Sequence, residues 1–351
     1  MIINNTPVRT SKNFGINNIE LKLFEMPKRR EEFNNITISG ESQDFDIINE
    51  VSRVPLVYGL GEELENQVYE NSNRDIKIEV SSNKKKNLYI EYNFDKENTS
   101  LIDNIEIIAK PSSQGTIYIK YMSEDEELRE YHNGIIKLKA SENSNIDVVI
   151  INLLNRKADN FLSIENEIHE QANVKYCIVD FGGKTSISNY YSSLEGKNSK
   201  SDLNTIYLGT ENQLFDINYI VEVKKEQAEA NIEVQGALQD NAVKNFKGTI
   251  DFKKGCKKAK GNENEFCMLL SDTAKSKALP MLLCTEEDVE GSHSTAAGKV
   301  EEDMLFYIMS RGISEKEAMK LIVKAKFNNI INNINDEELR QIILDEIDKR
   351  I

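Results

Sequence analysis

The sequence has no tryptophan, and it holds only three histidines, four cysteines and five prolines in 351 residues. So few histidines leave little material for imidazole-based acid–base or metal chemistry. The cysteines lie far apart, with no Cys-x-x-Cys pair, which excludes a disulfide framework and a self-contained zinc or cluster site. The absence of tryptophan also counts against a protein that acts on carbohydrate.

Long apolar runs and an excess of basic charge are missing too. No segment approaches the roughly 20 continuous apolar residues of a membrane helix, and the start, MIINNTPVRTSKNFG, lacks the apolar stretch of a secretory signal. The net charge of −15 argues against nucleic acid or an anionic membrane as partner. We therefore expect a cytoplasmic protein with neither kind of partner. An acidic surface suits a protein partner with a basic docking face.

Common catalytic signatures are absent. The sequence contains no Gly-x-x-x-x-Gly-Lys-Ser/Thr phosphate loop, no Gly-x-Ser-x-Gly elbow and no His-Glu-x-x-His. These absences favour a protein without catalytic activity of its own. A polysaccharide-active enzyme using carboxylates such as Asp147 or Asp180 stays open, because sequence cannot identify a correctly spaced pair among 59 acidic residues.

Short alternating runs fill the chain from about Arg74 to Leu283, for example DIKIEV, NLYIEYNF and GTIYIKYM. Period-two alternation with β-branched and aromatic residues predicts strands with one buried face. A sandwich, a barrel and a β-solenoid all fit, and without a strict repeat the pattern alone slightly favours a sandwich. We divide the chain into an N-terminal cap region at 1–73, a β core at 74–290 and a C-terminal helical domain at 291–351.

The C-terminal domain has helical signals. A first helix from about Val300 to Arg311 begins with acidic residues and ends before a glycine. Ser314 and Asn335 are the predicted N-caps of two further helices. Two apolar stripes mark the faces that these helices should bury, Ala318/Leu321/Ile322/Ala325 and Leu339/Ile342/Ile343/Ile347.

Two features of this domain could serve binding. Residues 304–309 are six consecutive apolar or aromatic residues, so one face of this helix either caps the β core or meets a partner. His293 lies in a Gly-Ser-His-Ser loop ahead of the helix, where hydrogen bonding to a carbonyl is the commoner fate of a histidine. His132 is expected in a turn, and His169 at a solvated position.

The run LFYIMSRGISEKEAMKLI, residues 305–322, closely resembles the C-terminal signature of the SufB/SufD family of iron–sulfur cluster assembly scaffolds. The resemblance is strong over 284–327, weaker over 237–283, where GALQDNAVKNFKGTIDF also resembles the family, and slight before residue 230. It implies a mainly β fold with an irregular right-handed parallel β-helix core, which reverses the preference for a sandwich. The ends of such a core must be capped.

The resemblance further implies a non-catalytic, SufD-like scaffold of the SUF system. It would pair with a SufB-like paralogue, or form a homodimer when alone, and dock a SufC-like ABC-type ATPase that alone binds ATP. ATP-driven dimerisation of the ATPase would open the interface with the paralogue. The ATPase-docking residues would be Met304, Phe306, Tyr307, Ser310, Arg311 and Gly312.

Resemblance also implies that His293 is an iron or cluster ligand at the paralogue interface, holding a transient iron–sulfur cluster shared with the partner. An imidazole at an open, shared site suits a cluster that must be released. The chain departs from the family at Ser294, where glycine is usual, and at Gly291, where some relatives have cysteine.

The key cysteine of SufB-type members falls at or near Glu265. Cys267 lies two residues further and would share a strand face with it, while Cys284 could be an auxiliary ligand or sulfur acceptor. The alternative is therefore a SufB-like or combined scaffold that pairs with itself and uses Cys267 or Cys284. The simpler interpretation makes Cys177 and Cys267 core residues. The lysines beside Cys256 would lower its pKa if that thiol were exposed.

Overall fold

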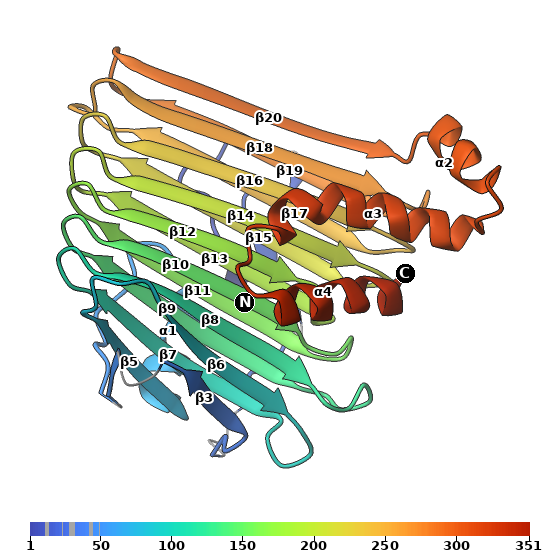
Figure 1. Ribbon diagram of the computed structural model, residues 1–351, viewed down its shortest axis with the longest axis horizontal. Helices are drawn as coiled ribbons and strands as arrows, with labels where there is room; N and C mark the ends of the chain where they lie inside the picture. Colours follow the sequence, from blue (N-terminus) through green and yellow to red (C-terminus); the bar gives the residue numbers. More distant parts are fainter. Residues whose placement is uncertain (11–13, 23, 28–31, 42–44, 49) are drawn as a thin grey trace.

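The computed structural model describes the chain except residues 11–13, 23, 28–31, 42–44 and 49. Its centre is a β-solenoid in which each coil contributes one strand to each of two facing sheets (Figure 1). One sheet, sheet B, has the order β20-β18-β16-β14-β12-β10-β8-β6-β3, and the other, sheet C, β19-β17-β15-β13-β11-β9-β7-β5-β4. The mainly β fold with C-terminal helices is confirmed, as a solenoid and not a sandwich.

The elements have the following bounds. The solenoid strands are β5 (Arg74–Val80), β6 (Lys86–Phe94), β7 (Ser100–Ala109), β8 (Gln114–Ser123), β9 (Tyr131–Ala140), β10 (Asn145–Leu153), β11 (Asp159–Ile168), β12 (Asn173–Asp180), β13 (Thr185–Leu194), β14 (Lys200–Gly209), β15 (Leu214–Val223), β16 (Glu229–Leu238), β17 (Val243–Phe252), β18 (Ala259–Leu269), β19 (Lys275–Cys284) and β20 (Val289–Lys299). The other elements are β1 (Ile2–Ile3), β2 (Ile19–Glu20), β3 (Ile36–Gly40), β4 (Phe45–Ile48), α1 (Glu62–Asn71), α2 (Glu302–Met309), α3 (Glu315–Ile331) and α4 (Glu337–Arg350).

The coils repeat in space although the sequence has no fixed period. Six successive turns from sheet C to sheet B, from β7–β8 to β17–β18, each contain a non-glycine residue of positive φ, at Ser112, Asn143, Gln171, Asn198, Gln227 and Lys258. Successive members of this series are 31, 28, 27, 29 and 31 residues apart. Each donates its backbone N–H to a carbonyl in the following turn, such as Ser112 to Glu142 at 2.9 Å. Backbone hydrogen bonding therefore sets the repeat, while loop lengths vary.

The lumen, meaning the space between the two sheets, is the main hydrophobic core. At its first end the chain closes the sheets with antiparallel strands, β3 on β6 and β4 on β5. At the other end, within the described part of the chain, no strand pairs with the outer edges of β19 and β20. We call these two edges and the lumen between them the open end. Unpaired backbone groups at such an edge can pair with another chain.

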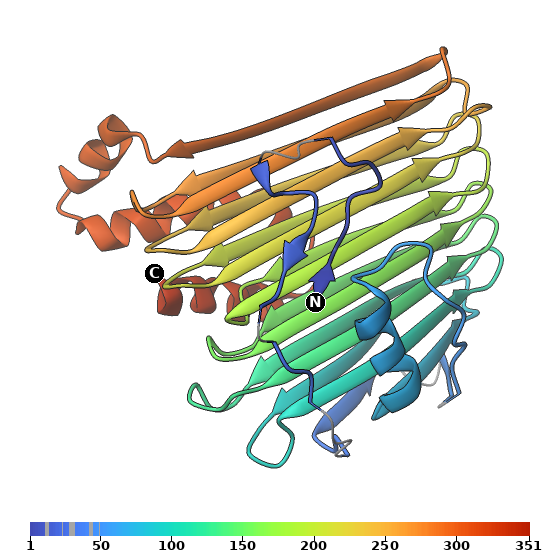
Figure 2. The same ribbon diagram turned by 180° about the vertical axis from the view of Figure 1, so that it is seen from behind.

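The outer faces of both sheets are partly covered. β1, β2 and α1 lie across sheet C (Figure 2), where Ile3, Leu64 and Val68 pack on the sheet. Asn4 is fully buried there, and its side-chain amide donates to a carboxylate oxygen of Asp216 at 2.7 Å. Helices α3 and α4 cover part of sheet B. No helix among the described residues is long and apolar enough to span a membrane.

Several local predictions need correction. The Gly-Ser-His-Ser segment is not a loop but part of β20, because it pairs in register with β18. The N-terminal cap region contains helix α1, which was not predicted from the sequence. The N-cap of α4 is Asp336, one residue after the predicted Asn335. The Ser314 cap is confirmed by its bond from the Glu317 N–H.

The stripe predicted for α3 is confirmed at Ala318 and partly at Ile322 but is wrong at Leu321 and Ala325, whereas that of α4 is confirmed at Leu339, Ile343 and Ile347. Leu321 is 48% exposed, and the buried face of α3 is formed by Ala318, Val323, Phe327, Ile330 and Ile331. The sheet beneath α3 selects this face, because it presents Val179, Phe181 and their neighbours to the helix.

Truncating Phe327 should loosen the C-terminal helices. Its ring is fully buried and stacks on Phe181 with a centroid distance of 6.2 Å. We expect Phe327→Ala to cost about 3–5 kcal/mol, seen as faster hydrogen exchange in α3 and α4 than in the solenoid strands. Leu321→Ala on the same helix is the control and should cost less than about 1 kcal/mol. Equal effects of the two substitutions would contradict this packing.

Candidate functional site

His293 lies on the last strand, β20, at the open end. Its side chain is exposed, but its strand position directs it toward the lumen. Gly291, two residues earlier on the same face, points to the lumen, because a Cβ there would lie 2.8 Å from the Leu282 side chain and 3.1 Å from Phe252, both from sheet C. The open end therefore gives the imidazole access to solvent and to the lumen.

Glu263 is directly beneath His293, because the two residues are paired in register on β18 and β20. The Glu263 carboxylate is fully buried, and neither oxygen has a hydrogen-bond partner among the described residues. Gly248 makes room for it, since a Cβ there would lie 2.0 Å from Glu263 Oε1. Burial raises the pKa of Glu263 to about 8, and the nearby Glu265 charge adds to the effect.

Glu265 is paired within the chain. Lys244 donates from Nζ to its Oε1 at 2.6 Å, and Tyr207 donates to the same oxygen at 3.1 Å. All three side chains are buried, and the Lys244 ammonium lies 5.8 Å from the centroid of the Tyr207 ring. The position predicted to match the SufB-type cysteine thus carries a carboxylate that is already neutralised.

The cysteines do not gather around His293. Cys267 is buried in the lumen in register with Ala297, four residues along β20 from His293, which corresponds to about 13 Å. Cys284 is exposed at the end of β19, where its thiol donates to the Glu286 carbonyl. Within the described chain, no three His, Cys, Asp or Glu side chains form a group that could hold a metal.

The remaining cysteines are core residues. Cys177 is buried against the C-terminal helices, as predicted, and burial raises its pKa to about 12. Cys256 is also buried, so the expected activation by its lysine neighbours does not occur. Desolvation, followed by the charge of Glu286, raises its pKa to about 11.

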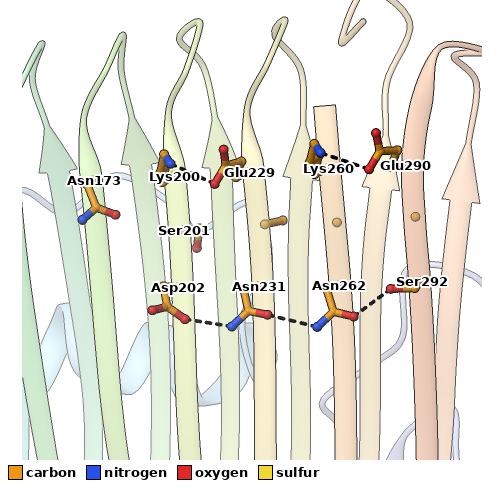
Figure 3. Close-up of a pocket in the computed structure, with 13 residues that line it drawn as sticks. Asn173, Lys200, Ser201, Asp202, Glu229, Asn231, Lys260, Asn262, Glu290 and Ser292 are labelled. Atoms are coloured by element: carbon orange, nitrogen blue, oxygen red, sulfur yellow. Dashed lines mark hydrogen bonds and ion pairs between the residues drawn. The ribbon is translucent and has the colours of Figure 1, made fainter. Parts of the chain in front are cut away.

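A polar groove of about 720 Å³ crosses the outer face of sheet B beside the open end (Figure 3). In it Asp202, Asn231, Asn262 and Ser292 form a hydrogen-bonded row across four strands, with distances of 2.9, 3.2 and 2.7 Å. The row ends at Ser292 on β20, where sheet B itself ends. An added strand would therefore meet a polar edge on the outside and His293 on the inside.

Helix α2 exposes most of its apolar residues. The exposed fractions are 47% for Met304, 73% for Phe306 and 60% for Tyr307, and α2 has no buried residue. After the helix, Arg311 donates to the Tyr307 hydroxyl at 2.8 Å, and Gly312 turns the chain with φ of 85°. This patch remains available to a partner.

The other histidines and the two suggested acids are placed differently. His132 is fully buried in β9, not in a turn, with Nε2 2.9 Å from Asp103. His169 directly follows β11 and contacts Glu167 near the end of that strand. Asp180 faces the lumen and bonds Ser186, whereas Asp147 lies on the opposite face of sheet B beside Lys85. These two carboxylates cannot form the catalytic pair of a polysaccharide-active enzyme.

The chain is similar to proteins of one described family. Residues 92–326 match the family described as SUF system FeS cluster assembly, SufBD core domain. The iron–sulfur cluster assembly protein SufD of Bacillus subtilis is 22% identical over 261 residues, which are 74% of this chain and 60% of that protein. A SufBD family protein of Pyrococcus horikoshii is 32% identical over 166 residues, 46% of this chain and 36% of that protein.

SufD of Escherichia coli is 25% identical over 170 residues, which are 48% of this chain and 40% of that protein. The chain thus spans only 36% to 60% of the length of these relatives. The family match nevertheless covers most of the solenoid, helix α2 and most of α3. It confirms the resemblance first seen in residues 305–322, and the chain belongs to the SufBD family of SUF-system iron–sulfur cluster assembly proteins.

Proposed function

We propose that this chain is a SufD-like scaffold subunit that pairs with a SufB-like paralogue through its open end. The observation that carries the proposal is the place of His293, exposed on the terminal strand and directed to the lumen where both sheets have free edges. A partner that extends the sheets would bring its own ligands over the imidazole. An iron–sulfur cluster, the cargo of the system, would then be held between two chains.

The SufD-like assignment is favoured over a self-pairing, SufB-like scaffold by position 265. Glu265 is bound by Lys244 and Tyr207, and Cys267 is buried, with its pKa raised by burial. Neither offers a free thiolate at the interface. Cys284 is an exposed thiol and remains a candidate sulfur acceptor at the end of β19. A homodimer through the same edges is the state expected when the paralogue is absent.

The second part of the proposal concerns helix α2, whose apolar patch we assign to a SufC-like ATPase. Phe306 and Tyr307 are both exposed, and Arg311 donates a hydrogen bond to the Tyr307 hydroxyl. The chain has no phosphate-binding loop of its own. ATP would therefore be bound and hydrolysed only by the docked partner, whose dimerisation would move α2 and strain the open-end interface.

Phe306→Ser should weaken ATPase docking about thirtyfold or more, the loss typical of a central aromatic residue at an interface. The measurement is co-purification of the chain with its candidate SufB-like and SufC-like partners, followed by titration of the ATPase. Because Phe306 is 73% exposed, the fold should be unchanged. Val57→Ser, at a residue 63% exposed in the N-terminal region, is the matched control. Equal ATPase affinity of both variants would refute the assignment of α2, and failure of any complex to form would refute the scaffold role.

A further inference from the structure

Glu263 differs from every other buried carboxylate in the described part of the chain. It alone has both oxygens buried and without a hydrogen-bond partner, whereas the others keep at least one. Burying a carboxyl group without a hydrogen-bond partner costs free energy whether or not it carries a proton, so the arrangement calls for a partner that the described chain does not supply. The nearby cation, Lys244, is committed to Glu265 at 2.6 Å.

The site is shaped to keep this carboxylate. Gly248, facing it from sheet C, leaves the space that any larger residue would fill, since even a Cβ would approach Oε1 to 2.0 Å. Pro280 covers the same position in the next coil, in register with Gly248. Glu263 is therefore held at the last fully covered layer of the lumen, one coil below the open end.

His293 is the side chain in register above it. Adjacent strands of a sheet are about 4.8 Å apart, and residues paired in parallel register point to the same side. The imidazole of His293 and the unpaired Glu263 carboxyl group therefore occupy successive layers of the lumen next to the open end. We propose that Glu263 and His293 together form a two-ligand half-site for a divalent transition metal, with ferrous iron as the physiological ion. This rests on the proposed function, in which His293 is a ligand.

The chemistry fits such an ion. Imidazole nitrogen and carboxylate oxygen are both suitable ligands for Fe²⁺, and the cation would supply the counter-charge that Glu263 lacks. The described chain contains no third ligand of this kind in reach. The other coordination positions must come from water, sulfide or the partner across the open end. A site with only two ligands from this chain would release its metal readily, as assembly requires.

Anaerobic titration of the full chain with Co²⁺, followed by visible absorption and by thermal unfolding, tests the half-site. Glu263→Gln and His293→Ala should each weaken Co²⁺ binding about tenfold or more, and the metal should stabilise these two variants against unfolding less than it stabilises the wild type. Glu290→Gln is the matched control, because this exposed carboxylate on β20 pairs with Lys260 at 3.1 Å on the outer face. It should bind Co²⁺ as the wild type does.

The outcomes separate the two proposals. If His293→Ala weakens binding and Glu263→Gln does not, Glu263 is no ligand and the half-site is overturned, while the role of His293 survives. If neither substitution has an effect, the half-site is overturned, and the ligand role of His293 then depends on the cluster retained by the complex. Gly248→Ala gives a second test, because its methyl group must displace the Glu263 carboxylate without removing it. Unchanged Co²⁺ affinity in a folded Gly248→Ala variant would also contradict the half-site.

Discussion

Replacing Lys244 by methionine is expected to lower the free energy of unfolding by about 3–5 kcal/mol, because it leaves a buried carboxylate without its counter-charge. The Lys244 ammonium and the Glu265 carboxylate are 2.6 Å apart, and both side chains are almost completely excluded from solvent. The methionine has a similar length, so the loss of charge should dominate over the loss of packing. Chemical denaturation monitored by circular dichroism measures the change.

A second substitution separates the electrostatic contribution of the Lys244–Glu265 pair from the effect of lost side-chain packing. In Lys244→Met/Glu265→Gln no charge is left unpaired, and the amide oxygen can still accept from Tyr207. We therefore expect the double variant to be more stable than Lys244→Met alone. Lys200→Met is the surface control, because its pair with Glu229 is about half exposed and should contribute about 1 kcal/mol or less. A Lys244→Met variant no less stable than this control would contradict the buried pair.

The pairing also explains why Glu263 and Glu265, two residues apart on one strand face, have different roles. Glu265 has Lys244 and Tyr207 as permanent partners, so it helps to hold the two sheets together. Glu263 has no such partner and faces the coil that carries His293. We therefore expect Glu265 to contribute mainly to stability and Glu263 mainly to metal binding, although the two residues are neighbours on the same face of β18. Lys244→Met should affect mainly the first, and Glu263→Gln mainly the second.

Much of the fold was predictable because strand alternation is a local property. The runs from DIKIEV to the end of β19 alternate clearly, and Ser314 caps its helix as its sequence indicates. Alternation could not distinguish a solenoid from a sandwich, because the turns through Ser112, Asn143 and their successors are unevenly spaced. The solenoid could be preferred over the sandwich only because residues 305–322 resemble the family.

The errors arose where tertiary contacts override local pattern. Gly291 to Gly298 is rich in small residues and looks like a loop, yet it is a strand because β18 offers it a complete parallel ladder. The buried face of α3 depends on Val179 and Phe181 in the sheet beneath it, which local spacing does not reveal. Helix α1 likewise packs on Tyr131 and Ile135 of a strand distant in the sequence, β9.

Only one residue of the candidate site, His293, could be predicted from the sequence. His293 stood out because the chain has so few histidines and because its context resembles the family. Glu263 is one of 59 acidic residues, and its importance depends on register with His293 and on the space left by Gly248. Lys244 is equally inconspicuous, because a lysine in an alternating strand normally faces solvent. Only the solenoid stacking reveals these partners.

His293→Ala should abolish stable cluster retention without disturbing assembly of the complex. The side chain is exposed on β20, so its truncation removes little packing. The substitution would remove the exposed imidazole that lies at the open end. We expect at least about a tenfold loss of retained iron and sulfide, by analogy with the effect of disturbing other metal sites. His169→Ala, at a partly exposed histidine far along the solenoid, is the control.

Anaerobic iron–sulfide reconstitution of the co-purified complex, comparing wild type with His293→Ala, is the most direct measurement of the central claim. We expect both complexes to assemble and only the wild type to keep a full, stable cluster absorption band. Equal cluster loading in the two complexes would contradict it, and would reduce His293 to a residue that lines the interface.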